Sequence, residues 1–255
     1  MKVCLLASGS KGNALLVCTG RSRVLVDAGL SARELCRRLA MAGVAPEDLD
    51  AVLVTHEHID HVRGLGPLSR RYGVPVYLHH EAAAALADNQ RLARVVEFAA
   101  GPELVIGDLA IRAFPVTHDA QAPVGFSFDD GAGRTGVATD LGVATRLVAE
   151  ELRNCRTLVL ESNHDEDMLR DGPYPWPLKQ RIRSSHGHLS NRDSAGLLET
   201  LCWEGLENVL LAHLSETNNH PELARRAAEQ TLAGQDLCRP QLLVGSQDRP
   251  TAWAG

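Results

Sequence analysis

Four side chains that can bind a metal ion lie within six residues, directly after a short apolar run. Residues 52–54 are Val-Leu-Val, which is typical of a buried strand. The sequence Thr-His-Glu-His-Ile-Asp-His follows, and its candidate ligands are His56, His58, Asp60 and His61. In an extended segment His56 and His58 point the same way. One short loop could therefore offer two imidazoles to one cation and a carboxylate with an imidazole to a second.

The chemical types of these ligands indicate a catalytic metal rather than a structural one. Imidazole and carboxylate groups without thiolates suit zinc, manganese or iron, whereas structural zinc sites are usually rich in cysteine. A polar loop that happens to contain histidine is the alternative interpretation of any single residue here. Four ligand-type side chains in register after a hydrophobic strand favour the metal site.

Other polar residues also follow predicted strands. They are His118, Asp140, His164 and His213. An α/β scaffold builds a site by bringing side chains from strand ends onto one rim. Each of these residues alone could be an ordinary turn residue, but their common position predicts that several of them join residues 56–61 in one site.

Short strands and helices must position these side chains. Besides 52–54, strands are predicted over 2–7, 14–18, 23–26, 74–78, 95–98, 103–106, 109–115, 124–128, 135–138, 157–160, 209–212 and 241–244. Helices are predicted over 32–42, 61–72, 81–87, 143–152, 193–203 and 221–232. Ser31 is predicted to cap the first of these helices, and Gly73 to end the second.

The order of these elements predicts the fold class. Strands first form meanders and then alternate with helices, and both halves of the chain show this mixture. The pattern favours an α/β fold of two packed sheets with helices outside, as a single domain over residues 1–255. Residues 246–255 are expected to form an irregular tail.

Composition describes an ordinary globular protein with few aromatic residues. Of the 255 residues, 44% are hydrophobic, 23% are charged and 4% are aromatic, so the core must consist mainly of Leu, Val and Ala. The net charge of −6 gives no global reason to bind nucleic acid or an anionic membrane. Any polyanion would have to meet a local basic patch.

Cysteine usage and hydropathy predict a cytoplasmic protein. The six cysteines form no Cys-x-x-Cys pair, and several lie in apolar runs, which is typical of free buried thiols in a reducing compartment. The apolar run at the start is broken at Ser8, well short of a signal peptide. No segment approaches the length of a membrane span, so we expect a soluble protein with no membrane partner.

The motifs together resemble the metallo-β-lactamase fold superfamily over nearly the whole chain. The superfamily pattern is Thr-His-x-His-x-Asp-His after a strand, followed by an isolated His, Asp and His at later strand ends. Further motifs resemble the YycJ/WalJ group: Gly-Ser-x-Gly-Asn at 9–13, Glu-Ser-Asn-His-Asp at 161–165, Tyr-Pro-Trp at 174–176, Gly-His-Leu-Ser-Asn at 187–191 and Ala-His-Leu-Ser-Glu-Thr-Asn-Asn at 212–219. The resemblance implies an αββα four-layer sandwich with a two-metal site along one edge.

The resemblance also implies which residues hold which metal. The first metal would be bound by His56, His58 and His118. The second would be bound by Asp60, His61 and His213, with Asp140 bridging the two. Two divalent cations, zinc and/or manganese, about 3.5–4 Å apart would share a hydroxide and hold the oxygen of an incoming phosphoryl or carbonyl group.

Two more residues receive roles from this resemblance. Asp27 resembles the first-motif aspartate of the superfamily and is expected to orient a ligand imidazole by a hydrogen bond. His188 resembles the Gly-His-Ser histidine of the transfer-RNA 3′-processing ribonucleases, which lies by the scissile phosphate. There it could protonate the leaving oxygen or stabilise charge, so Asp60 and His188 are the predicted catalytic residues. The alternatives are a plain turn residue for Asp27 and a surface histidine for His188.

Several polar residues are candidate supporting or substrate-binding groups. They are Ser8, Ser10, Asn13, Asn163, His164, Lys179 and Ser190. Lys179 belongs to a basic cluster with Arg181 and Arg183, which could contact phosphate or could be a solvated helix face. Tyr174 and Trp176 could stack on a base, or could hold a proline-rich loop in place. The serines near the N-terminus could instead belong to a tight turn.

Fold alone does not decide the reaction, because this superfamily hydrolyses several kinds of ester and amide. The YycJ/WalJ resemblance implies a phosphodiesterase, acting as a 5′-to-3′ exonuclease on DNA. The lack of a long inserted domain favours small or single-stranded substrates. The alternative is a small-molecule ester, thioester or lactone hydrolase using the same two metals. A non-enzymatic regulator with a vestigial site is disfavoured, because all seven ligand positions are filled.

Overall fold

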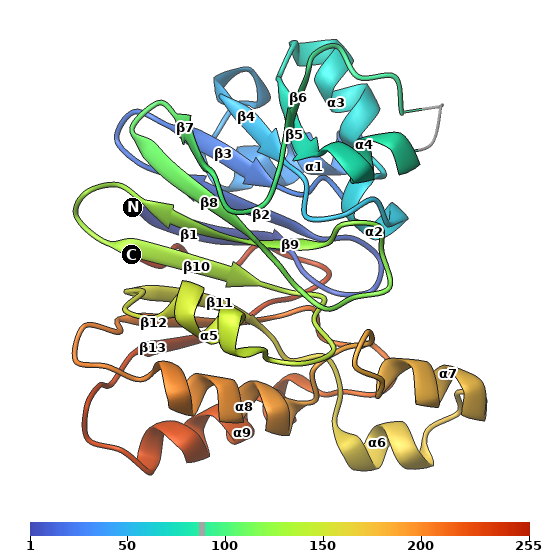
Figure 1. The fold of residues 1–255 in the computed structure, drawn as a ribbon, viewed down its shortest axis with the longest axis vertical. Coiled ribbons are helices and arrows are strands. Elements are labelled where there is room, and N and C mark those ends of the chain that lie inside the picture. The colour runs from blue at the N-terminus through green and yellow to red at the C-terminus, as the bar shows by residue number, and fades with distance from the viewer. Residues whose placement is uncertain (87–89) are drawn as a thin grey trace.

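Two β-sheets pack face to face, and helices cover their outer faces (Figure 1). The computed structural model describes residues 1–86 and 90–255. Within these residues the first sheet contains, in spatial order, β1 (Lys2–Ala7), β2 (Ala14–Cys18), β3 (Arg23–Val26), β4 (Ala51–Leu53), β5 (Val76–His79) and β6 (Val95–Phe98). The second contains β13 (Gln241–Val244), β12 (Asn208–Ala212), β11 (Thr157–Glu161), β10 (Arg134–Ala138), β9 (Val124–Asp129), β8 (Leu109–Pro115) and β7 (Glu103–Ile106).

Both sheets combine an antiparallel part with a parallel part. Strands β1 to β3 are antiparallel, and β3 to β6 are parallel. The second sheet repeats the plan, with β7 to β10 antiparallel and β10 to β13 parallel. The meander followed by helix crossovers was predicted from the sequence in both halves. Because parallel strands point the same way, their carboxyl ends meet at one edge of each sheet.

The helices lie in two outer layers. Over the first sheet lie α1 (Ala32–Met41), α3 (Leu65–Tyr72) and α4 (His80–Ala85), and over the second lie α5 (Arg146–Leu152), α8 (Asn191–Leu201) and α9 (Pro221–Ala233) (Figure 1). Three more helices flank the sheet edge: α2 (Ile59–Val62), α6 (Glu166–Asp171) and α7 (Trp176–Ile182). In Figure 1 the layers follow the order helices, sheet, sheet, helices, which is the predicted αββα sandwich. The turn Pro46–Asp48 is a short 3-10 helix.

Three apolar clusters hold these layers together. The central cluster lies between the sheets and contains mainly Val and Leu with Phe126 and Phe128. A second cluster packs α5, α8 and α9 onto their sheet, and a third packs α1 and α3 onto the other. Burying each Leu or Val side chain contributes about 1.5–3 kcal/mol. The core therefore consists mainly of Leu, Val and Ala, as the composition predicted.

The predicted helix over 61–72 is in fact two helices, α2 and α3. Gly64 separates them, because a Cβ at this position would lie 2.2 Å from the carbonyl oxygen of Leu30. The Gly64 N–H donates to Ala28 O at 2.8 Å and so fixes this close approach. Helix α2 begins at Ile59, two residues before the predicted start, and carries Asp60 and His61 on a helical turn. At its other end α3 stops at Gly73, whose φ of 68° gives the predicted left-handed cap.

Two further helices, α6 and α7, were not predicted. Asp165 begins α6 by accepting hydrogen bonds from the backbone N–H groups of Asp167 and Met168. Proline lies in the first turn of α7, where its missing N–H costs nothing, so the proline-rich segment starts a helix rather than preventing one. The other helix boundaries differ from prediction by a few residues, and the predicted helix end at Ala87 lies outside the described residues.

The last ten residues lie along the open edge of β1. Ala254 and Val3 exchange two backbone hydrogen bonds of 2.9 and 2.8 Å, and the Thr251 N–H donates to Leu5 O at 2.9 Å. The segment covers backbone groups that an edge strand would otherwise expose. Within the described residues no helix is long and apolar enough to cross a membrane.

Substitution of Gly29 tests how closely the loop after β3 packs against the short helix α2. A Cβ on Gly29 would lie 1.6 Å from Asp60 O, so Gly29→Ala must displace the backbone that carries Asp60. We expect a loss of about 3 kcal/mol in the free energy of unfolding, measured by urea denaturation. Gly20→Ala is the matched control, because no atom lies within 4 Å of its added Cβ. Equal urea midpoints for the two variants would contradict this account of the contact.

Candidate metal centre

The candidate ligands converge where the carboxyl ends of strands from both sheets meet. Asp27 follows β3, residues 56–61 follow β4, Asp140 follows β10 and His213 follows β12. Three of these residues have left-handed backbones, with φ of 62° at Asp27, 57° at Asp140 and 57° at His213. Residues other than glycine rarely adopt this conformation, and such strain is concentrated at functional sites. The turns therefore bend sharply to direct these side chains into one place.

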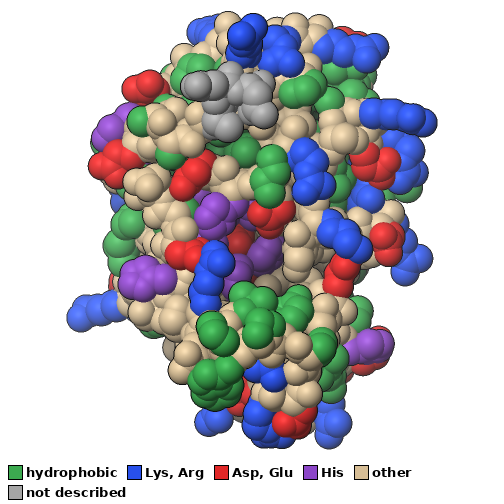
Figure 2. Space-filling view, turned by 90° about the vertical axis from the view of Figure 1, so that its right-hand side faces the viewer, with side chains coloured by type: hydrophobic (Ala, Val, Ile, Leu, Met, Phe, Trp, Pro, Cys, Tyr) green, Lys and Arg blue, Asp and Glu red, His purple; other side chains and the backbone are tan. Residues whose placement is uncertain are grey.

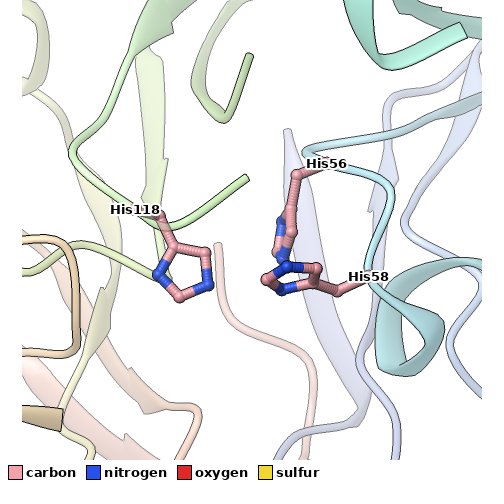
Figure 3. Close-up of side chains that lie close together, drawn as sticks. All are labelled: His56, His58 and His118. Atoms are coloured by element: carbon pink, nitrogen blue, oxygen red, sulfur yellow. The ribbon is translucent and has the colours of Figure 1, made fainter. Parts of the chain in front are cut away.

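The first group of ligands is His56, His58 and His118. Figure 3 shows His56 and His58 on one loop and His118 on the opposite side, with their rings directed into a common space. One nitrogen from each ring lies within 4.8 Å of the others. His118 Nδ1 lies 3.1 Å from Gly187 O and His56 Nδ1 lies 3.0 Å from Thr55 Oγ1, so the Nε2 atoms of both rings are left for a ligand.

The second group is Asp60, His61 and His213. Asp60 Oδ2 lies 3.4 Å from His61 Nε2 and 3.6 Å from His213 Nε2. Asp140 lies between the two groups: its Oδ2 is 3.4 Å from His61 Nε2, and its Oδ1 is 3.5 Å from His213 Nε2 and 3.8 Å from His118 Nε2. All seven residues that the sequence assigned to metal binding are thus brought together.

These spacings fit metal ligands better than hydrogen bonds. Most of the contacts are longer than the roughly 2.7–3.2 Å of a good N–H to O hydrogen bond. Ligands that each lie about 2.1 Å from a shared tetrahedral cation are about 3.4 Å from one another. Moreover His56 Nε2, Asp140 Oδ2 and His213 Nε2 are buried and have no hydrogen-bond partner among the described residues. The histidine and carboxylate donors therefore fit a divalent cation such as zinc or manganese.

Asp27 contacts a candidate ligand as the sequence predicted. Its Oδ2 lies 2.7 Å from His61 Nδ1, so it can accept the proton of that nitrogen and leave Nε2 without a proton. Thr55 holds the carboxylate in place, with its N–H donating to Oδ1 at 2.8 Å and its hydroxyl to Oδ2 at 2.9 Å. A carboxylate in this position orients the imidazole and increases its basicity.

Glu161 makes the same kind of contact, and sequence reasoning gave it no role. Its Oε1 lies 2.8 Å from His188 Nδ1 and 3.0 Å from His213 Nδ1, while Oε2 accepts from the N–H groups of Leu141 and Leu189. This single buried carboxylate orients one candidate ligand and one predicted catalytic residue. The available signal was an acidic residue directly after the apolar run 157–160.

The ionisation of the centre follows from burial and from close pairs of opposite charge. Burial lowers the pKa of His56 well below its usual value, which favours the neutral form that binds metals. Burial alone would also lower the pKa of His61, but the carboxylates of Asp140 and Asp27 outweigh it and raise the pKa. Burial would raise the pKa of Asp60, yet the imidazoles of His213 and His61 lower it. The imidazoles of His213 and His61 therefore favour the ionised form of Asp60, and a bound cation could supply the same positive charge.

A cavity of about 380 Å³ opens beside the ligands. Figure 2 shows histidine and acidic side chains gathered in a hollow on this face, with hydrophobic side chains along one border. His188 lines the cavity next to the candidate ligands, with its ring centroid 5.0 Å from that of His118 and 5.2 Å from that of His213. Polar Ser10, Asn163 and Ser215 also line it. Ser215 was not among the substrate-binding residues predicted from the sequence.

Of the predicted supporting residues near the N-terminus, two hold ligands in place rather than facing the cavity. The Ser8 hydroxyl accepts a hydrogen bond of 2.6 Å from the His213 N–H. Asn13 Nδ2 lies 3.2 Å from His61 Nε2 and 3.4 Å from Asp60 Oδ2. Asn163 combines both functions, because it lines the cavity and donates to His213 O at 2.9 Å.

Three predicted substrate contacts are placed elsewhere, and none of them is among the described residues that line the cavity. The Lys179 ammonium donates to Arg170 O and Gly172 O, both at 2.7 Å, and ties α7 to the end of α6. Ser190 caps α8 by accepting from the Asp193 N–H at 3.1 Å. His164 is 3% exposed, and burial lowers its pKa to about 4. A basic run and a strand end do not by themselves specify which way a side chain points.

Comparison with known proteins agrees with this geometry. The family described as the beta-lactamase superfamily domain matches residues 22–214. The chain is 39% identical over 241 residues to exodeoxyribonuclease WalJ of Streptococcus pneumoniae, covering 92% of this chain and 90% of the relative. The chain belongs to the metallo-β-lactamase superfamily. It is also 38% identical over 231 residues to exodeoxyribonuclease YycJ of Bacillus anthracis, covering 89% of this chain and 88% of that one.

A solved structure supports the same fold. The metallo-β-lactamase fold protein YhfI from Bacillus subtilis superimposes with a TM-score of 0.75 at 18% identity and covers 98% of both chains. The predicted superfamily, its WalJ/YycJ-like group and the fold class are therefore confirmed. As a member of this superfamily with its histidine and aspartate cluster assembled, the protein is a metal-dependent hydrolase.

The role of Asp27 is testable by metal affinity. Asp27→Asn removes the charge that orients His61, and we expect the affinity for zinc to fall about 10- to 100-fold. The measurement is competition with a chromophoric chelator. Asp50→Asn is the matched control, since Asp50 also accepts a backbone hydrogen bond, from the Arg23 N–H at 2.7 Å, but lies outside the centre. Unchanged affinity in Asp27→Asn would contradict the orienting role.

Proposed function

We propose that this protein is a two-metal exodeoxyribonuclease that shortens DNA in the 5′-to-3′ direction. The observation that carries this proposal is His188, which lines the cavity beside the candidate ligands while its Nδ1 lies 2.8 Å from Glu161 Oε1. A hydrolase that uses its metals alone has no requirement for such a residue. Two relatives similar over about nine-tenths of the chain are named exodeoxyribonucleases, which supports the same assignment.

The proposed metals have a complete set of ligands. His56, His58 and His118 would hold the first, and Asp60, His61 and His213 the second. Asp140 lies between the groups and would bridge them. When bound, two divalent cations, zinc or manganese, would activate a water molecule and polarise a phosphoryl oxygen.

His188 is placed to transfer a proton. Its Nδ1 is engaged by the Glu161 carboxylate, which leaves Nε2 for a substrate in the cavity. Proton donation from this atom to the leaving oxygen would remove the cost of expelling an alkoxide. To donate from Nε2 while Nδ1–H is held by Glu161, the ring must be the imidazolium, and the Glu161 carboxylate orients it and stabilises its charge. The same carboxylate oxygen also contacts His213 Nδ1 at 3.0 Å.

The surroundings suit a DNA strand, and single-stranded DNA is favoured. Ser10, Asn163 and Ser215 can donate hydrogen bonds to phosphate or sugar oxygens in the cavity. Trp176 is 61% exposed at the start of α7, and Tyr174 lines the cavity, so both can stack on unpaired bases. All six cysteines are free, as expected in the cytoplasm, which we propose as the location.

A small-molecule ester, thioester or lactone hydrolase remains the second candidate. The observation that favours it is the apolar part of the cavity lining, Tyr174, Leu178 and Ile182, which could also hold an acyl group. A hydrolase of this kind would cleave thioesters or lactones without acting on nucleic acid and would be indifferent to changes at His188.

The decisive measurement is digestion of 5′- and 3′-labelled DNA and RNA, single- and double-stranded. The metal-free protein is supplied in turn with zinc, manganese and magnesium. We expect 5′-to-3′ shortening of DNA that is abolished in Asp60→Ala, which removes a ligand. In His188→Ala the rate should fall about 100-fold, because general acid catalysis is lost.

His186→Ala is the control for these variants, since His186 is an exposed histidine two residues before His188. It should digest DNA at the wild-type rate. Bound metal without cleavage of any nucleic acid would overturn the nuclease proposal. Hydrolysis of thioesters and lactones would then be measured with the same variants. Digestion from the 3′ end would correct the polarity alone.

A further inference from the structure

Arg181 brings a guanidinium group to the cavity beside the candidate metal centre. The carboxylates of Asp60, Asp119 and Asp140 line this cavity, and among the described lining residues Arg181 is the one lysine or arginine. Arg181 comes from α7, and its side chain is 62% exposed. A permanently charged guanidinium in a cavity lined by carboxylates and imidazoles can attract an anionic ligand.

Asp119 holds Arg181 next to the metal ligands. The guanidinium Nε and Nη2 atoms both contact Asp119 Oδ2, and Asp119 Oδ1 lies 3.4 Å from His118 Nε2. The guanidinium is thus one carboxylate away from an atom assigned to metal binding. Its Nη1 makes no hydrogen bond within residues 1–86 and 90–255, so part of the planar donor group remains available. Because the Asp119 carboxylate separates the guanidinium from the candidate metal ligands, Arg181 suits a phosphate next to the scissile one rather than the scissile phosphate itself.

The same helix presents apolar surface to the cavity. Leu178 and Ile182 are four residues apart on one face of α7, and Tyr174 precedes the helix, so the three side chains lie together along the lining. All three are only partly buried. The two hydrogen bonds from Lys179 to the end of α6 hold α7 in this position. A cation beside apolar and aromatic surface is the combination that binds a nucleotide through its phosphate and its base.

We propose that α7 with Tyr174 forms a subsite for the nucleotide next to the scissile bond. Arg181 binds the phosphate of that nucleotide by exchanging Asp119 for it, and Tyr174, Leu178 and Ile182 contact its base and sugar. This inference rests on the proposed nuclease function and adds to it the residues that recognise substrate beyond the reacting phosphate.

The test is the salt dependence of KM for single-stranded DNA in wild type, Arg181→Ala, Arg181→Lys and Arg183→Ala. Each lost phosphate contact lowers the slope of log KM against log salt by about 0.7. We expect Arg181→Ala to lose about this amount and to show a KM raised about tenfold at low salt. Arg181→Lys should keep the slope and recover part of the KM, because it keeps the charge but not the planar donor group.

Arg183→Ala is the matched control, since Arg183 is the exposed residue that ends α7 and does not line the cavity. It should behave as wild type, and the metal content of all variants is measured alongside. Equal slopes for Arg181→Ala and Arg183→Ala, in an enzyme that cleaves DNA, would overturn the subsite and leave the nuclease proposal standing. A raised KM with an unchanged slope would also overturn it, because it would indicate a structural role. Absence of DNA cleavage by wild type would overturn both proposals.

Discussion

The structure depends on keeping ionised carboxylates buried at the edge where the two sheets meet. Asp27, Asp140 and Glu161 are at most 3% exposed. Removing an ionised carboxylate from water costs several kcal/mol unless opposite charge and hydrogen-bond donors replace the lost hydration. Imidazoles supply the opposite charge. Backbone N–H groups supply the hydrogen-bond donors, as those of Leu141 and Leu189 do for Glu161. The fold therefore gives both oxygens of Asp27 and of Glu161 a partner, whereas Asp140 Oδ2 has none among the described residues.

The same requirement explains the backbone near the site. Asp27, Asp140 and His213 each adopt a left-handed conformation directly after or close to a strand end. Each such residue costs about 1–3 kcal/mol, which persists only where the surrounding structure compensates. Compensation comes from the aliphatic clusters on both faces of each sheet, which hold the strands rigid up to their last residues. Rigid strands and strained turns together hold the imidazoles at distances suited to a shared cation.

Chemistry and recognition are carried by different parts of the molecule. The candidate metal ligands follow the strands of the sandwich, which is shared with structures as distant as 18% identity. The proposed subsite includes α7, which lies at the side of the sandwich and is attached through Lys179 and the end of α6. Because one scaffold supports many reactions, the substrate must be argued from this attached region and from His188 rather than from the fold.

The sequence was sufficient for whatever depends on local spacing. Apolar runs predicted most strands, and the spacing of residues 56–61 indicated a metal site. The set of seven candidate ligands came from the resemblance to the superfamily, since position after a strand alone also included His164. The local sequence pattern gave wrong helix boundaries where tertiary packing determines where a helix begins or ends. Gly64 divides a predicted helix because of its approach to Leu30, and proline near Trp176 starts a helix that looked irregular.

Side-chain direction was decided only by tertiary structure. Glu161 appeared to be the polar end of a strand, yet it joins His188 to His213 across the second sheet. Lys179 and Arg181 are two residues apart and carry the same charge, but one turns toward backbone carbonyls and the other toward the cavity. The sequence by itself determined which chemical groups are present and which strand ends carry them. Tertiary structure decided which groups meet, because contacts between residues distant in the chain depend on the packing of two sheets and not on local spacing.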